Sequence, residues 1–224
     1  MSTYKRALKI AFGNLSNKLS VDEKFIIDIY EDEQSWSFIS KLAQLIEGVF
    51  TEILVQRLNE PDTFGMISNL PQSTRIALSY DLKIIDKEQK FIFLTIAEIR
   101  NDYIHNISNM GVSLNEYLSE LKKPRQTEIF KRFKPFISDQ EITSEKFIED
   151  CQKQIFIVCA LEILKAHANV EALHAIRKHK NFRAKQAEKL IPKKLERSSF
   201  IEDRLMILDH VENSRDILEK NGLL

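Results

Sequence analysis

Glycine and proline are scarce in this chain, each occurring five times among 224 residues. A many-stranded sheet needs a turn about every ten residues, and these two residues supply many of the conformations that such turns require. With so few turn-formers, long stretches run without interruption, and this favours helices joined by a small number of connections. The sequence therefore predicts an all-α fold.

Apolar residues recur at helical spacing along most of the chain. The widest apolar faces predict three long helices, over residues 34–58, 87–108 and 144–168. Shorter helices are expected over residues 2–18, after Ser20 and after Ser73, and only short amphipathic pieces over residues 113–139. Asp86 is the expected cap of the helix at residue 87, and Gly111 its expected stop. The three long helices are expected to form a bundle.

Charge and cysteine content indicate a soluble protein of a reducing compartment. The 33 basic residues balance 33 acidic ones, so no global charge drives the chain onto nucleic acid or membrane. Cys151 and Cys159 lie about 12 Å apart on one predicted helix, too far for a disulfide. The N-terminal apolar stretch is too short for a signal peptide, and no apolar run is long enough to span a bilayer. We expect a cytoplasmic protein without membrane contact.

The composition changes near His174. Residues 174–194 hold eight Lys or Arg against one Glu, and after Pro192 an amphipathic helix is expected to begin at Ser199. We therefore divide the chain into a helical bundle, residues 1–170, and a basic segment with a C-terminal helix, residues 171–224, which docks on the bundle or stands apart. The residues expected to contact nucleic-acid phosphates are Arg177, Lys178, Lys180 and Arg183. A solvated helix face is the commoner explanation of such a run.

One polar cluster stands out as a candidate site once metal sites and nucleotide-binding motifs are excluded. The five histidines are scattered, and neither zinc-ligand spacings nor phosphate-binding glycine loops occur, so we expect no metal and no cofactor. The cluster consists of Arg100, Asn101 and His105 at the end of a strongly apolar helix. Asn101 and His105 are four residues apart and share one side of that helix, with Arg100 about 100° round.

These residue types suit metal-independent cleavage of RNA. Arginine presents a charged fork that fits phosphate oxygens, and histidine titrates near neutral pH and can move a proton. His105 would take the proton from a ribose 2′-hydroxyl, Arg100 would stabilise the charge at phosphorus, and Asn101 would orient either residue.

A structural interpretation of the cluster stays open. An Arg–Asn pair near a helix end often satisfies carbonyls or a neighbouring acid, here Glu98 or Asp102, and the helix dipole alone favours a histidine at a C-terminus.

Residues 74–106 read TRIALSYDLKIIDKEQKFIFLTIAEIRNDYIHN. This stretch resembles the signature region of the mannitol-operon repressor family, which belongs to the HEPN superfamily of helical bundles. There an Arg-x-x-Leu-Ala-Tyr-like helix leads to a Gly-Leu-Ile-like break, and the next helix ends in Ile-Arg-Asn-x-Phe-Ala-His. The counterparts here are Arg75, Ala77, Leu78, Tyr80, Ile84, Ile85, Ile99, Arg100, Asn101, Tyr103 and His105. Lys83 replaces the family glycine, and Ile104 replaces the usual alanine.

The resemblance implies a HEPN-like bundle with additional C-terminal helices and two alternative functions. Many HEPN proteins are metal-independent ribonucleases of toxin–antitoxin and anti-phage systems, dimers in which two Arg-x4-6-His motifs face one cleft. Others, including the mannitol-repressor branch, are non-catalytic regulators that bind a partner. A protein partner encoded nearby is expected in either case.

A homodimer is also expected from the residues themselves. The helix around Arg100 carries apolar residues on most of its sides, namely Phe91, Ile92, Phe93, Leu94, Ile96 and Ile99. Surplus apolar surface commonly meets a partner. Burial of the helix in the centre of the bundle is the alternative.

Overall fold

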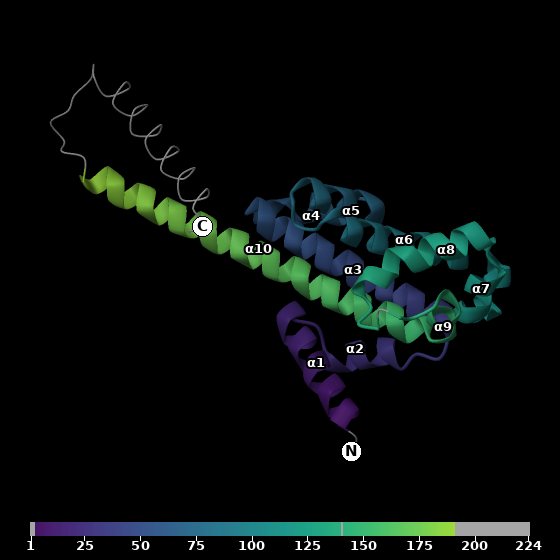
Figure 1. Ribbon diagram of the computed structural model, residues 1–224. Helices are drawn as coiled ribbons and strands as arrows, with labels where there is room; N and C mark the ends of the chain where they lie inside the picture. Colours follow the sequence, from purple (N-terminus) through teal and green to yellow (C-terminus); the bar gives the residue numbers. More distant parts are fainter. Residues whose placement is uncertain (1–2, 140, 191–224) are drawn as a thin grey trace. The chain divides into compact units, whose positions relative to one another are not determined.

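The computed structural model describes residues 3–139 and 141–190, and this part of the chain contains helices and no strand (Figure 1). The all-α prediction is thereby confirmed for the described residues. The chain divides into two units, residues 1–174 and 175–224. The helix expected after Ser199 lies outside the described residues.

The first unit is built from helices of very different length. The α-helices are α1 (Thr3–Leu19), α2 (Glu23–Tyr30), α3 (Ser35–Leu58), α4 (Phe64–Ser68), α5 (Gln72–Asp81), α6 (Lys87–His105), α7 (Leu114–Glu120), α8 (Lys123–Phe133), α9 (Ser144–Glu149) and α10 (Cys151–Leu190), which continues into the second unit. Three 3-10 turns join them: η1 (Pro61–Thr63), η2 (Ile107–Gly111) and η3 (Lys134–Phe136). No helix in the described ranges is long and apolar enough to cross a bilayer.

The core is centred on the pairing of α6 with α3. The two helices pack face to face, with α5 and α8 also against α6, and their aromatic rings meet where Phe50 and Phe93 lie 4.9 Å apart. Four of the six apolar residues around Arg100 (Ile92, Phe93, Ile96 and Ile99) are buried in this core. Most of the apolar surface of α6 is therefore used inside the bundle, and the expected homodimer stays a prediction.

The start of α6 agrees with the sequence. Asp86 accepts a hydrogen bond from the backbone N of Gln89 (2.8 Å), and the Gln89 side chain accepts one from the backbone N of Asp86 (2.9 Å). This reciprocal capping box satisfies two backbone donors that a helix start leaves open. Asp86 is thus the cap that the sequence predicted.

The end of α6 was predicted three residues too late. The helix stops at His105, because Asn106 takes an extended conformation (φ −123°, ψ 97°) and its side chain accepts a hydrogen bond from the Ser108 backbone. Gly111 consequently ends the 3-10 turn η2 and not α6 itself. His105 therefore occupies the last residue of the helix, next to its unpaired carbonyls.

Two other helix boundaries were also predicted wrongly. The helix expected over residues 144–168 is divided at Asp150 (φ −111°, ψ 21°), which ends α9, and α10 continues well past residue 168. The cap expected at Ser73 is wrong because Pro71 takes the N-cap position and α5 begins at Gln72. The proline side chain has no hydrogen-bond acceptor, so the first turn of α5 receives no side-chain cap from this position.

Cys151 and Cys159 behave as the sequence predicted, since both are buried free thiols in α10. Burial raises the pKa of the Cys151 thiol to about 12. Both cysteines are therefore core residues in the uncharged form.

Candidate functional site

Arg100, Asn101 and His105 occupy the last two turns of α6. Asn101 and His105 are exposed, and Arg100 is half-buried. Arg100 donates a hydrogen bond from Nη1 to Oδ1 of Asn101 at 3.2 Å. Arg100 and His105 point about 140° apart around the helix, so this bond draws the guanidinium toward the side that Asn101 and His105 share.

The neighbouring carboxylates have other partners and leave Arg100 free of them. Glu98 pairs with Arg125 and Arg132 of α8. Asp102 accepts a hydrogen bond from the Tyr117 hydroxyl at 2.5 Å. Within the described residues Arg100 takes part in no ion pair, so neither Glu98 nor Asp102 is its partner there.

A set of contacts that the sequence did not reveal holds the end of α6 in place. Tyr103 is buried and donates from its hydroxyl to the carbonyl of Val112 at 3.2 Å, and its ring lies 5.3 Å from that of Tyr117. Asn109 donates to the carbonyl of Asp102 at 3.1 Å. Burial raises the pKa of Tyr117, and its bond to Asp102 raises it further. Tyr117 therefore stays protonated and keeps this bond at any pH near neutrality.

The candidate site lies on the surface of the bundle. Among the hollows of the described structure, three of about 310 to 530 Å³ are each lined by other residues. Exposed apolar side chains flank His105 instead: Ile104 is 40% exposed, Ile107 82% and Met110 43%. A closed cleft around the motif would thus need a second surface laid over these residues.

The chemistry available here is that of a guanidinium bonded to Asn101 and an exposed imidazole in the last two turns of the same helix. A guanidinium without a carboxylate partner can accept phosphate oxygens in its fork. The imidazole at the helix end is exposed and can exchange protons with a ligand or with solvent. No group of three or more potential metal ligands occurs in residues 3–139 and 141–190.

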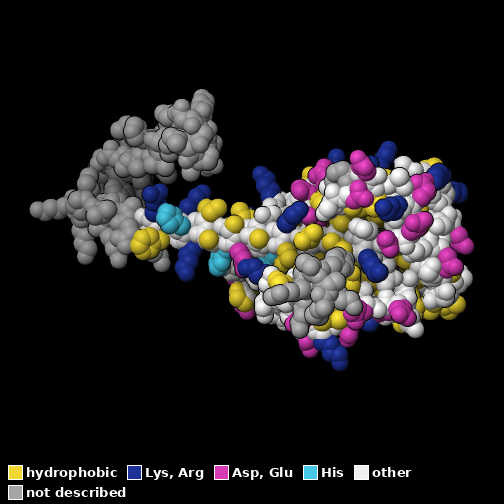
Figure 2. Space-filling view, turned by 60° about the horizontal axis from the view of Figure 1, so that its bottom comes forward, with side chains coloured by type: hydrophobic (Ala, Val, Ile, Leu, Met, Phe, Trp, Pro, Cys, Tyr) yellow, Lys and Arg dark blue, Asp and Glu magenta, His cyan; other side chains and the backbone are white. Residues whose placement is uncertain are grey.

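The four basic residues predicted to contact nucleic acid belong to the second unit. Arg177, Lys178, Lys180 and Arg183 are all exposed on α10, and Lys and Arg side chains stand out from this end of the helix in Figure 2. On the visible face of the first unit, acidic and basic side chains are interspersed. The local charge excess that the sequence indicated is therefore available to solvent.

Replacing these four residues with glutamine should weaken RNA binding and flatten its salt dependence. Each lost phosphate contact removes about 0.7 from the slope of log K against log salt for a single strand. The measurement is a binding titration across a salt series, and the matched control carries four exposed lysines of the first unit changed to glutamine (Lys24, Lys122, Lys123 and Lys146). Equal slopes for both variants would mean that the run only keeps the helix soluble.

No protein-family model matches this chain, and neither the curated proteins nor the solved structures provide a significant match. A functional assignment therefore depends on the residues described above and on the resemblance of residues 74–106.

Proposed function

We propose that this chain is a HEPN-type protein that acts on RNA as a metal-independent endoribonuclease of a toxin or phage-defence type. The observation that carries the proposal is the state of Arg100, which bonds Asn101 and leaves Glu98 and Asp102 to other partners. A purely structural arginine at a helix end is expected to pair with a nearby acid. A phosphate-binding arginine must be free to exchange its partner.

The reaction needs only the groups present at this site. His105 takes the proton from the 2′-hydroxyl, the O2′–P bond forms, and the P–O5′ bond breaks as the leaving oxygen receives that proton back from the imidazolium of His105. Arg100 stabilises the extra negative charge on the phosphoryl oxygens, and Asn101 holds the guanidinium in position. The products are a 2′,3′-cyclic phosphate on one fragment and a free 5′-hydroxyl on the other.

The connection before α6 adds support for the family resemblance. Lys83, which replaces the family glycine, has a φ of 58°. This left-handed conformation is the one that glycine adopts most readily. A backbone conformation that favours glycine is therefore present at the position where the family has glycine.

Purified protein should cleave mixed RNA in the presence of a chelator as fast as in its absence. This follows because Arg100 and His105 supply both the charge stabilisation and the proton transfer. The fragments should carry 2′,3′-cyclic phosphates, which mass spectrometry of a short oligonucleotide detects. Cleavage that stops on chelation, or fragments with a 5′-phosphate, would rule out this mechanism.

We further propose that a homodimer completes the site. The exposed apolar residues Ile104, Ile107 and Met110 lie beside His105, and the two-fold pairing of such a patch would bring two motifs to one interface. Ile107→Glu should shift the protein to a monomer in sedimentation velocity, because each copy would bury an unpaired carboxylate. Ile10→Glu, at an exposed isoleucine of α1, is the control. A wild-type monomer at high micromolar concentration would contradict the proposal.

The second candidate function is a non-catalytic regulator of the mannitol-operon repressor type, acting through a bound partner. The observation that favours it is the position of the motif outside all three hollows described above. In that case the same apolar patch receives a different protein, and the wild type cleaves no RNA.

A further inference from the structure

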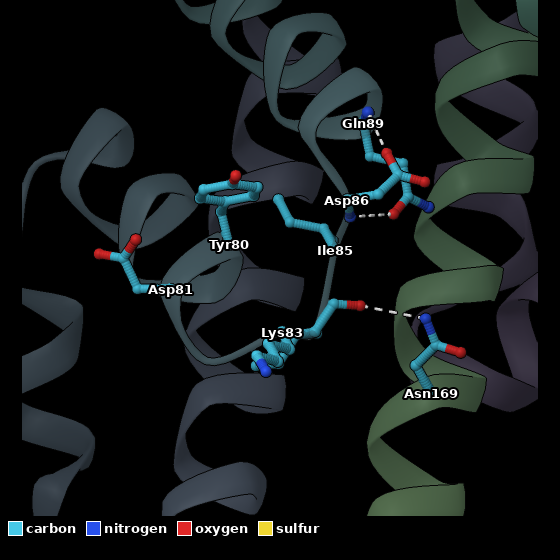
Figure 3. A pocket seen from close by; sticks show the side chains of 8 residues that line it. Tyr80, Asp81, Lys83, Ile85, Asp86, Gln89 and Asn169 are labelled. Carbon is cyan, nitrogen blue, oxygen red and sulfur yellow. Dashed lines mark hydrogen bonds between the residues drawn. The ribbon is translucent and has the colours of Figure 1, made fainter. Parts of the chain in front are cut away.

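Two hollows flank the N-terminal half of α6. The first, about 530 Å³, lies between the end of α5, the connection over residues 82–86 and α10, and Figure 3 shows the Tyr80 ring beside Ile85 in it. The second, about 310 Å³, lies between α6 and α8 and includes Phe91. Tyr80 is 36% exposed and Phe91 is 37% exposed. Each hollow therefore presents part of an aromatic ring to solvent.

A cation lies over the ring in each hollow. The Lys90 ammonium is 4.6 Å from the centroid of Tyr80, and the Lys87 ammonium is 5.9 Å from that of Phe91. Arg132 also lies 5.4 Å from the Phe91 ring. A ring that stacks on a base, together with a nearby cation that meets the phosphate, is the combination by which proteins bind single-stranded nucleic acid. Lysine side chains are flexible enough to leave a ring when a base arrives.

Two of the four carboxylates that line these hollows are engaged in other contacts. Asp86 accepts the hydrogen bond that caps α6, and Glu128 pairs with both Arg125 and Arg132. Asp81 and Glu88 are exposed, and a carboxylate at such a position can accept a hydrogen bond from the exocyclic amino group of a base.

Lys87, whose ammonium lies over the ring of the second hollow, is in line with His105 along α6. Lys87 and His105 are separated by about five turns, so they share one side of α6 about 27 Å apart. Glu98 is the acidic residue on that side, and its charge is offset by Arg125 and Arg132. A single strand running along α6 would therefore meet no unpaired carboxylate between the hollows and Arg100.

We propose that the two hollows bind bases of a single-stranded RNA, which stack on Tyr80 and Phe91 while Lys87 and Lys90 contact the adjoining phosphates. The strand then continues along α6 to Arg100 and His105. This inference rests on the proposed function, because it names single-stranded RNA as the substrate class and assigns its binding to residues outside the Arg-x4-His motif.

The test is a fluorescence-anisotropy titration of a labelled single-stranded RNA, made in the His105→Ala background so that the RNA survives. Tyr80→Leu and Phe91→Leu should each weaken binding about fivefold or more, whereas Tyr80→Trp and Phe91→Trp should retain it, since stacking needs an aromatic face. Phe64→Leu is the control, because Phe64 is 57% exposed in the third hollow and no cation lies over its ring in the described structure. Thermal unfolding verifies that every variant is folded.

The inference is overturned if the folded leucine variants bind as tightly as the parent, or if a duplex RNA binds as tightly as the single strand. If the wild type cleaves RNA and the leucine variants still bind it as tightly as the parent, the inference about the two hollows is overturned and the proposed catalysis stands. If binding depends on Tyr80 and Phe91 but the wild type does not cleave RNA, the inference is supported and the proposed catalysis is overturned. An absence of both cleavage and single-strand binding overturns both.

Discussion

His105→Ala should abolish RNA cleavage and leave the bundle folded. General acid–base catalysis by a single histidine contributes roughly 10²- to 10⁴-fold to a rate, whereas an exposed histidine at a helix C-terminus contributes only about 0.3–1 kcal/mol to stability through the dipole. His105 is exposed at the last residue of α6, so its removal leaves no cavity. Cleavage is measured as the single-turnover rate on a labelled oligonucleotide, and stability as the midpoint of thermal unfolding.

Arg100→Ala should lose cleavage to a similar extent, and Arg100→Lys should not restore it. An ammonium offers a point charge, whereas the guanidinium offers a planar fork that holds two phosphoryl oxygens. His174→Ala serves as the control for the His105→Ala variant, because His174 is also exposed on a helix. If the wild type does not cleave RNA and removal of Arg100 or Asn101 lowers the unfolding temperature, the cluster is structural.

Phe93→Ala should lower the free energy of unfolding by about 3–5 kcal/mol, the range found for a buried phenylalanine reduced to alanine. Phe93 is fully buried, and its ring meets Phe50 edge to face where α6 crosses α3. Total stabilities of single domains are about 5–15 kcal/mol, so this one change removes a large share. Urea unfolding followed by circular dichroism measures the difference.

Phe64→Ala is the matched control for this substitution. Phe64 is 57% exposed on α4, and changes at exposed positions usually stay within about 0.5 kcal/mol. The double variant Phe50→Ala with Phe93→Ala adds a coupling measurement, since edge-to-face pairs contribute roughly 0.5–1.5 kcal/mol beyond their buried area. A loss below about 1 kcal/mol for Phe93→Ala would mean that the α3–α6 contact is not the centre of the core.

Helices were easier to predict from this sequence than the points where they end. The apolar periodicity of α3 is carried by many residues at once, so its range was predicted within one residue at its start. Single backbone conformations decide the ends, such as the extended Asn106 after α6 or the break at Asp150 before α10. Either position is compatible with continued helix as far as the apolar pattern is concerned, so that pattern alone does not locate the break.

The candidate site was predicted in its residues but not in its surroundings. Residue type and spacing brought out Arg100, Asn101 and His105, because those properties are local to one helix. The partners of Glu98 come from α8, and the partner of Asp102 comes from α7. Pairs so distant in sequence leave no signal in a single chain. The two hollows beside α6 were missed for the same reason, since each is lined by segments that are far apart in the sequence.

Gln89 is engaged by two parts of the fold at once. Its side-chain oxygen closes the capping box at the start of α6, and its side-chain nitrogen donates to Glu162 of α10 at 2.8 Å, deep in the protein. Fraying of the first turn of α6 therefore breaks a buried bond to α10, and withdrawal of α10 leaves the first turn of α6 without part of its cap. We therefore expect the start of α6 and the adjoining part of α10 to open together. Their backbone amides, although far apart in sequence, should lose their protection from hydrogen exchange at the same time.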